Sequence, residues 1–327
     1  IQTSNSTPTC TGIICGSGSS GNGDIFVNEA INWGGSGSSN RLTLNSYRNI
    51  YIKAPIDATS NNANGKVSLL YGQGQADGKN DNSNEASYSF GLTAAGFSGS
   101  IKLNAGANLI TQLGSGGIAK NYTVIASLGS AGSTSASDLQ GINGGLTGNY
   151  ALGNDIDASA TSAWNAGAGF TPLSSFSGNF DGLGHDISFL KISTPTSFRL
   201  SSGLFGDNNG QVANVSLSNI SNSDSTAWYS GTLVGTNGGL IKNIFANSGN
   251  ITSTLADSHA SIGGVVGQNT SGFTIKTIWS NVSVSGGDSA KVGGVVGDNL
   301  GILDTVVNTG SVTGGNNSFV GGIAGQN

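Results

Sequence analysis

The chain has 327 residues, of which 55 are glycine and only 4 are proline, while 36% are hydrophobic and 9% are charged. Collagen needs glycine at every third position with abundant proline, so this composition excludes it, and low charge with this apolar content favours order over disorder. The net charge of −5, with 12 scattered Lys and Arg residues, argues against nucleic acid and anionic membranes as partners.

Two cysteines, Cys10 and Cys15, lie near the start of the chain in "CTGIIC". They predict one short-range disulfide if the protein is exported, and free thiols are the alternative. No histidine or second cysteine pair lies near them, which disfavours a zinc site. The chain begins with neither Met nor a signal-peptide pattern, and no apolar run approaches the roughly 18 residues of a membrane span.

The front of the chain contains a repeat with an offset of 25 residues. Residues 23–33 ("GDIFVNEAINW") align with residues 48–58 ("RNIYIKAPIDA"), and residues 41–46 align with residues 66–71 at the same offset. Apolar and polar residues alternate in these segments, which is the period of a strand with one buried face. Further on, residues 135–142 ("SASDLQGI") predict one short helix with Ser135 as its cap and Leu139 pointing inward.

The second half repeats a glycine-rich heptad, as in "GGVVGQN" at 263–269 and "GGVVGDN" at 293–299. Its central glycines recur at steps of 29, 32, 30 and 28 residues, and an asparagine follows two residues after each. A second module follows in each period and reads glycine, any residue, apolar, any residue, Asn or Thr, apolar. The recurring residues are Gly206, Gly235, Gly267, Gly297 and Gly325, with Asn208, Asn237, Asn269, Asn299 and Asn327.

Strands in repeats of about 25–32 residues cannot each bury a private core, whereas stacked coils can. We therefore predict an all-β fold, a parallel β-helix with coils of this length and roughly a dozen rungs spaced about 4.8 Å apart. Identical amides one rung apart can hydrogen-bond along the stack, so the asparagines predict a ladder. The glycines are expected to permit a tight corner where a Cβ would clash.

The repeats resemble a known family. "GLFGDNNGQVANVSLSNI" (203–220) and its successors look like GLUG repeats, residues 149–193 resemble the block that precedes them in large haemagglutinin-like exoproteins, and residues 23–58 resemble the repeats of filamentous haemagglutinin and high-molecular-weight adhesins. The resemblance covers nearly the whole chain and implies a right-handed parallel β-helix exported by two-partner secretion to a Gram-negative surface. The Asn-Pro-Asn motifs of that family's secretion domain do not occur here.

We divide the predicted solenoid into three consecutive parts. Residues 1–120 form haemagglutinin-type coils, residues 121–200 form the pre-repeat segment, and residues 201–327 form the GLUG-repeat coils. The last heptad stops at the final residue, so we expect the chain to be an internal segment of a longer fibre.

Candidate catalytic residues are few. Asp155 and Asp157 alternate onto one face of a predicted strand, as paired carboxylates could, but a turn aspartate beside a solvated one is the preferred interpretation, and Asp181 precedes a turn glycine. His185 is read as a structural turn residue and His259 as a surface loop residue. Without a HExxH or calcium-binding motif, we predict no catalytic residue, cofactor or metal.

No aromatic ladder is visible among Trp33, Trp164, Trp228 and Trp279, which share no repeat position.

The predicted function is structural and adhesive, without enzymatic activity. The resemblance implies a shaft segment of a secreted adhesin at the bacterial surface, with an outer-membrane two-partner transporter during export and a host-cell receptor or glycan as partner, and without nucleic acid or membrane insertion. A polysaccharide-active β-helix enzyme and the stalk of a contact-dependent toxin-delivery exoprotein are the alternatives.

Overall fold

A computed structural model describes residues 1, 23–32, 39–75, 85–193 and 200–327. The chain is mostly β-strand, and parallel stacked coils form a β-solenoid of about 7 turns, so the predicted fold class is confirmed. It divides into two compact units, residues 1–125 with 151–154, and residues 126–150 with 155–327. Cys10 and Cys15 lie outside the described residues. Within those residues, no helix has the length and apolarity to span a membrane.

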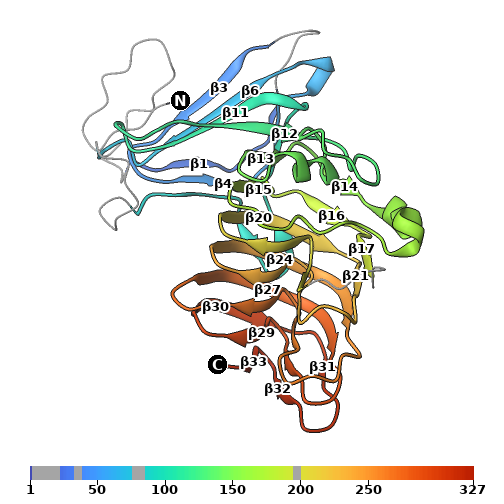
Figure 1. Ribbon diagram of the computed structural model, residues 1–327. Helices are drawn as coiled ribbons and strands as arrows, with labels where there is room; N and C mark the ends of the chain where they lie inside the picture. The colour runs from blue at the N-terminus through green and yellow to red at the C-terminus, as the bar shows by residue number, and fades with distance from the viewer. Residues whose placement is uncertain (2–22, 33–38, 76–84, 194–199) are drawn as a thin grey trace. The chain divides into compact units, whose positions relative to one another are not determined.

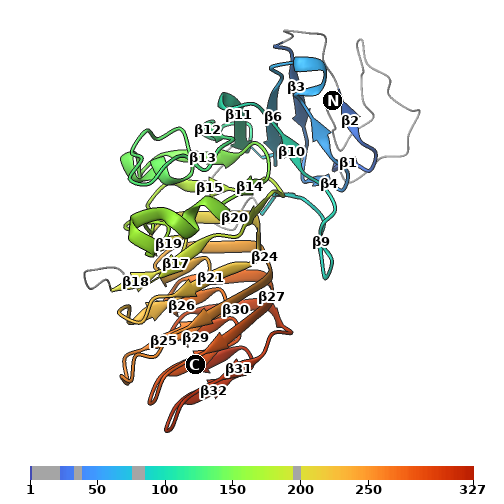
Figure 2. The same ribbon diagram turned by 90° about the vertical axis from the view of Figure 1, so that its right-hand side faces the viewer.

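The first unit contains three parallel rows, each with one strand from three successive coils (Figure 2). Ile25 pairs with Ile50 and Arg41 pairs with Lys66, so the repeat offset of 25 residues is the length of the first coil. The rows are β1 (Ile25–Val27), β4 (Ile50–Ile52) and β7 (Tyr88–Ser89); β2 (Ile31–Asn32), β5 (Ile56–Asp57) and β10 (Ile101–Lys102); and β3 (Arg41–Asn45), β6 (Lys66–Tyr71) and β11 (Gly106–Leu113).

Not all of the first unit is coil. β8 (Leu92–Thr93) and β9 (Gly96–Phe97) form an antiparallel hairpin, and β12 (Lys120–Ile125) pairs antiparallel with β11. A short 3₁₀ turn, η1, spans Ser60–Asn62. These segments take up chain that the repeat count assigned to coils, which is one reason why the structure has about 7 turns and not a dozen.

The short helix predicted at 135–142 is displaced. The structure has a 3₁₀ helix, η2 (Gln140–Gly144), and Ser135 does not cap it. The Ser135 hydroxyl donates instead to the Asp138 carboxylate at 2.6 Å, and the Gly141 N–H donates to the same carboxylate at 2.6 Å. This local network holds residues 135–139 in a turn, while Leu139 is fully buried as expected. A second 3₁₀ segment, η3 (Ser159–Gly167), was not predicted.

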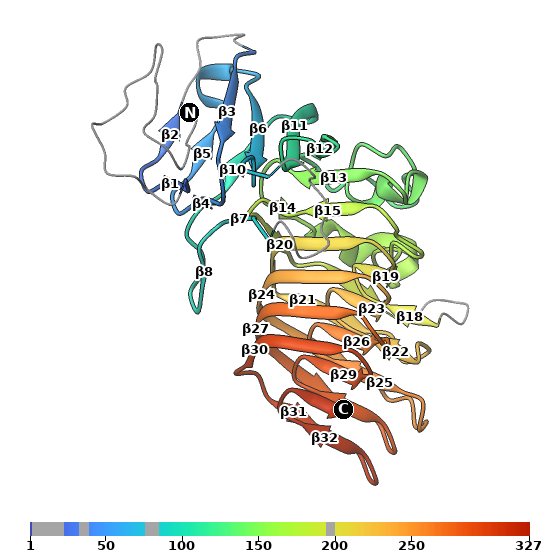
Figure 3. The same ribbon diagram turned by 90° about the vertical axis from the view of Figure 1, so that its left-hand side faces the viewer.

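In the second unit, successive coils stack in three parallel rows (Figures 1 and 3). The long row contains β20 (Gln211–Ser218), β21 (Ile220–Ser223), β24 (Leu240–Thr252), β27 (Thr274–Ser285), β30 (Ile302–Asn308) and β31 (Val312–Thr313). The first short row contains β18 (Ser201–Ser202), β22 (Tyr229–Ser230), β25 (Ser261–Gly263), β28 (Lys291–Gly293) and β32 (Phe319–Gly321). The second short row contains β19 (Phe205–Asn208), β23 (Val234–Asn237), β26 (Val266–Asn269), β29 (Val296–Asn299) and β33 (Ala324–Gln326).

Shorter strands precede these coils. They are β13 (Asn149–Leu152), β14 (Ile156–Asp157), β15 (Asn179–Asp181), β16 (Asp186–Ser188) and β17 (Lys191–Ser193). β15 and β16 both pair with β20, and β17 pairs with β21, so they begin the stacking that the repeats continue.

The core of the second unit is a set of apolar columns, because in-register coils place like residues above one another. Val234, Val266 and Val296 are partners in successive strands and are fully buried. At the start of the stack, the wider Phe205 ring packs against Phe180, with ring centroids 5.3 Å apart. The alternating apolar residues thus generate one continuous core along the coils.

The recurring glycines lie within the second short row and not at corners, because a close approach of two rows requires them. A Cβ at Gly267 would stand 2.5 Å from the Ser230 backbone nitrogen and 2.6 Å from the Gly235 carbonyl oxygen. Gly235 and Gly297 meet the backbone of the first short row in the same way. Glycine is therefore needed for packing of backbone on backbone.

Candidate functional site

An asparagine ladder runs along the second short row. The side-chain amide of Asn208 donates to Asn237 at 2.8 Å, Asn237 to Asn269 at 2.8 Å, Asn269 to Asn299 at 2.9 Å, and Asn299 to Asn327 at 2.6 Å. The first four of these asparagines are at most 5% exposed. All the bonds point the same way, so neighbouring amides can polarise one another in a low-dielectric interior.

Ladder amides also hold the turns that follow them. The Asn237 amide nitrogen donates to the Gly239 carbonyl at 3.0 Å, and the Asn269 amide nitrogen donates to the Phe273 carbonyl at 3.2 Å. The ladder therefore joins coils to one another and fixes the exit of each second-short-row strand toward the long row.

A second polar column crosses the long row. Asn214 donates its side-chain amide to both Asp181 oxygens, at 3.0 and 3.1 Å, and Asn243 donates to Asn214 at 2.9 Å. Asp181 also accepts the Leu183 N–H at 2.8 Å. Asp181 is therefore a buried structural acceptor, and the Asn of the second sequence module is its donor.

The Asn or Thr of that module takes a left-handed backbone in every coil. Asn214, Asn243, Thr277 and Thr305 have φ of 55°, 55°, 56° and 56°. Asparagine tolerates this conformation, whereas a β-branched threonine is strained in it. The repeated bend explains why one position of the module, between its apolar residues, is polar.

Thr277→Asn should stabilise the second unit by about 1 kcal/mol, because it relieves this strain. The urea unfolding midpoint should rise. Thr274→Asn in the same strand lies outside the left-handed bend and should give no gain, since asparagine is a poor strand residue. Equal midpoints for the two variants would show that the bend is not strained.

Asp155 and Asp157 do not act as a pair. Asp157 accepts the Ser159 N–H at 2.8 Å, and that backbone hydrogen bond holds the pKa of the Asp157 carboxyl below its ordinary value. Asp155 lies 3.0 Å from the Nδ1 atom of the buried His185 and accepts the Asp186 N–H at 3.0 Å. Each carboxylate thus holds a different turn.

Asp186 is a candidate that the sequence analysis missed. Burial raises the pKa of its carboxyl, hydrogen bonds from Ser216 and Ser218 lower it in part, and the charge of Asp155 raises it further. The Ser218 hydroxyl donates to it at 3.0 Å. No repeat or motif marks Asp186, because the raised pKa of its carboxyl depends first on burial and also on the charge of Asp155, 31 residues earlier in the chain.

Asp186→Asn should raise stability at about pH 7 by roughly 0.5–1 kcal/mol, after allowance for the water that still reaches this group. The folded-state pKa of Asp186 lies above the ordinary 3.8, so the protonated carboxyl favours folding below about pH 3.8. This contribution to stability is lost as the pH rises through the folded-state pKa. The gain should therefore vanish near pH 3 in thermal unfolding followed by circular dichroism. The control Asp157→Asn should lose stability at neutral pH, since that pKa is lowered. A pH-independent gain for Asp186→Asn would contradict the assignment.

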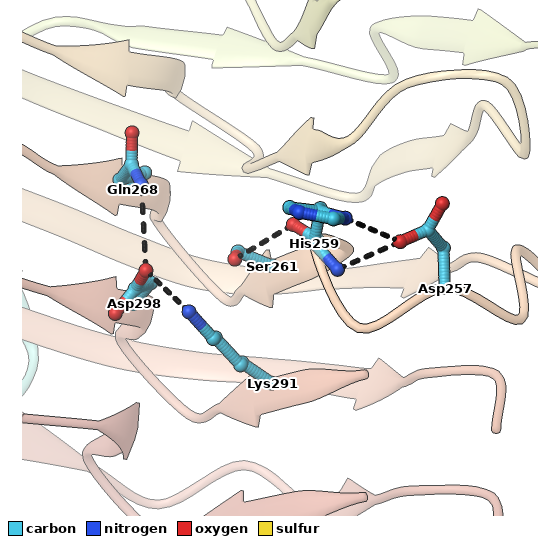
Figure 4. A network of polar contacts seen from close by, with 6 residues as sticks. All are labelled: Asp257, His259, Ser261, Gln268, Lys291 and Asp298. Carbon is cyan, nitrogen blue, oxygen red and sulfur yellow. Dashed lines mark hydrogen bonds and ion pairs between the residues drawn. The ribbon is translucent and has the colours of Figure 1, made fainter. Parts of the chain in front are cut away.

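A polar network connects the two short rows (Figure 4). The Lys291 ammonium lies 2.7 Å from Oδ2 of Asp298, and the Gln268 amide donates to the same oxygen at 3.3 Å. The Lys291 and Asp298 side chains are only 20% and 5% exposed. Within the described residues, Oδ1 of Asp298 has no hydrogen-bond partner, so this clamp carries a cost in free energy.

His259 is an exposed residue and lies beside this network (Figure 4). Its Nδ1 is 2.8 Å from Asp257, its ring stacks on Trp228 with centroids 5.3 Å apart, and its backbone carbonyl accepts the Ser261 hydroxyl at 3.2 Å. The backbone N–H of His259 is the main cause that lowers the pKa of Asp257. This arrangement orders the loop. In the described part of the chain, no three His, Cys, Asp or Glu side chains gather as metal ligands would.

The fold and the ladders define a β-solenoid built by stacking of like residues. An alignment of 168 positions, which covers 49% of this chain, is 38% identical to a protein named Halomucin from Haloquadratum walsbyi. The match covers 2% of Halomucin, so the chain spans a small part of the length of this relative. No protein-family model matches the chain, and no solved structure matches it.

Proposed function

We propose that the chain is a shaft segment of a secreted surface adhesin of the filamentous haemagglutinin type, with GLUG repeats. The unbroken asparagine ladder from Asn208 to Asn327 is the observation that carries this proposal, because it ties successive coils into a stiff stack. The shaft spaces a binding tip from the bacterial surface and supports attachment to a host-cell receptor or glycan. An outer-membrane two-partner transporter exports it.

Removal of one coil tests the shaft. Deletion of residues 238–269 joins Asn237 directly to the residue after Asn269, its partner in the next coil, and should leave a folded, shorter solenoid. Deletion of residues 238–253 removes half a coil and should unfold the stack. In the source organism, proteases should still reach the one-coil deletion variant on intact cells. Cells that carry this variant should attach less well than cells that carry the parent chain. A chain that proteases reach only after lysis would overturn the proposal.

A polysaccharide-active enzyme is the competing function, and the Asp155–Asp186 pair is the observation in its favour. A carboxyl with a raised pKa beside a second carboxylate is a pattern of acid–base sites. We propose that the chain is not an enzyme, since Asp155, Asp157 and Asp181 are engaged in separate structural hydrogen bonds. A glycan depolymerisation screen tests this, and activity that Asp155→Asn or Asp186→Asn abolishes would reverse it.

A further inference from the structure

Three successive coils of the second unit each present an Asn-X-Ser/Thr triplet in the same part of the long row. The triplets begin at Asn219, Asn250 and Asn281, so each starts 31 residues after the one before it. The first leads into β21 and the others lie within β24 and β27, which flank one another in the sheet (Figure 3). Ser221 is the register partner of Asn250, and Asn250 is the partner of Ser283, so the triplets overlap from coil to coil. This triplet, with X other than proline, is the acceptor pattern of N-linked glycosylation.

The alternation of the strands turns both polar groups of each triplet outward. The middle residues, Ile220, Ile251 and Val282, are at most 1% exposed and hold the triplets to the core. The Asn and the Ser or Thr on either side are exposed in all three triplets, because residues i and i+2 of a strand share a face. The fold therefore offers the amide and the hydroxyl of each triplet together on one accessible surface.

The amide nitrogens of these asparagines are not used by the fold. Within the described residues, none of the three donates a side-chain hydrogen bond. Where a bond exists, the side-chain oxygen makes it: Asn219 accepts the Ser248 hydroxyl and Asn281 accepts the Thr309 hydroxyl, each at 3.3 Å. The nitrogen, which is the atom that carries an N-linked sugar, is thus available at all three positions.

Two other triplets, which begin at Asn214 and Asn269, show the opposite arrangement. Asn214 is 1% exposed and its amide nitrogen donates to Asp181 at 3.0 Å. Asn269 is fully buried and its amide nitrogen donates to Asn299 at 2.9 Å. A sugar on either nitrogen would break a ladder and could not be accommodated in the core. The structure thus separates triplets that the sequence pattern alone does not distinguish.

We propose that Asn219, Asn250 and Asn281 are N-glycosylation sites, one on each of three successive coils. In the transfer, the amide nitrogen forms a bond to the anomeric carbon of a phosphate-activated sugar donor, the bond from that carbon to the phosphate oxygen breaks, and the amide proton passes to a base. Neighbouring coils lie about 4.8 Å apart, so the glycans form one crowded, hydrophilic stripe along the row. The inference goes beyond the shaft role, since the ladders hold the coils together without any sugar.

Peptide mapping by mass spectrometry, on the chain purified from its source organism, tests the sites. Peptides that contain Asn219, Asn250 or Asn281 should carry glycan masses, whereas peptides that contain Asn214 or Asn269 should be unmodified.

Substitution of the hydroxyl residues tests each site singly. Thr252→Ala should abolish the sugar at Asn250, and Ser283→Ala should abolish it at Asn281, although both asparagines remain. Ser285→Ala is the matched control, because Ser285 lies in the same strand as Ser283 and belongs to no triplet, so the sugar at Asn281 should persist. Circular dichroism of unglycosylated chains should show equal melting temperatures for the parent and all three variants, since the substitutions leave the core unchanged.

Several results would overturn the inference. Sugar on fewer than two of the three asparagines would do so, and so would equal modification of Asn214 and Asn269, which would show that burial does not select the sites. Sugar on the hydroxyl of Thr252 or Ser283, in place of the amide, would assign this surface to O-linked chemistry. All of these outcomes are read from peptide masses, so they are independent of the protease and attachment measurements that test the shaft.

Discussion

Asn269→Asp should destabilise the second unit by about 3–5 kcal/mol, the cost of a buried charge without a partner. The Asn269 amide nitrogen donates to Asn299 at 2.9 Å and to the Phe273 carbonyl at 3.2 Å. A carboxylate would place an oxygen against both acceptors, in a position that is fully buried. Urea unfolding should shift to a much lower midpoint, and hydrogen exchange should accelerate in β26 and β29.

Two further measurements separate the ladder from a general effect of the substitution. The new carboxyl regains a proton to donate when it is protonated, so the loss should shrink in acid. Asn219→Asp is the matched control, since Asn219 is exposed and its side-chain oxygen accepts the Ser248 hydroxyl at 3.3 Å, an interaction that a carboxylate keeps, and it should change stability by less than about 0.5 kcal/mol. If Asn269→Asp were as mild as this control, the ladder would not hold the coils together.

The repeats could be predicted because equal spacing forces equal position. Once Gly267 and Gly297 recur about one coil apart, stacked strands place Asn269 beside Asn299, and the observed register does so. The end of each coil was less predictable. The left-handed bend at Thr277 shows in the sequence only as an Asn-or-Thr position, and its conformation arises from the path of the whole coil.

The features that sequence analysis misplaced depend on contacts that have no repeat. The helix expected at 135–142 was displaced because Asp138 captures Ser135 and the Gly141 N–H, a competition that propensity alone does not rank. Asp186 could not be singled out, because its raised pKa arises from burial under β20 and from Asp155. The pairing of Phe245 with Trp279 also needed the structure. The two residues are of different types and occur in only two adjacent coils, so the sequence shows no repeat that would align them.

Gly267→Ala should destabilise the second unit by about 3 kcal/mol, at the upper end of the cost of overpacking. The added Cβ would meet three backbone atoms, the Ser230 nitrogen at 2.5 Å, the Gly235 carbonyl oxygen at 2.6 Å and the Tyr229 carbonyl carbon at 2.7 Å, and none of them can rotate away as a side chain could. The backbone of Gly267 is not left-handed, so steric contact with the first short row and with the preceding coil of its own row is the whole cause. The thermal midpoint of the second unit should fall accordingly.

Gly322→Ala provides the comparison that isolates this packing. Nothing lies within 4 Å of a Cβ at Gly322, and its backbone is likewise not left-handed, so alanine there should be neutral or slightly stabilising. If the two variants had equal midpoints, the short rows would be more loosely packed than the structure describes. If Gly267→Ala alone loosens the coils, it should also speed hydrogen exchange at Asn269, because the ladder amide reaches its neighbours only while the glycine two residues earlier lets the rows approach.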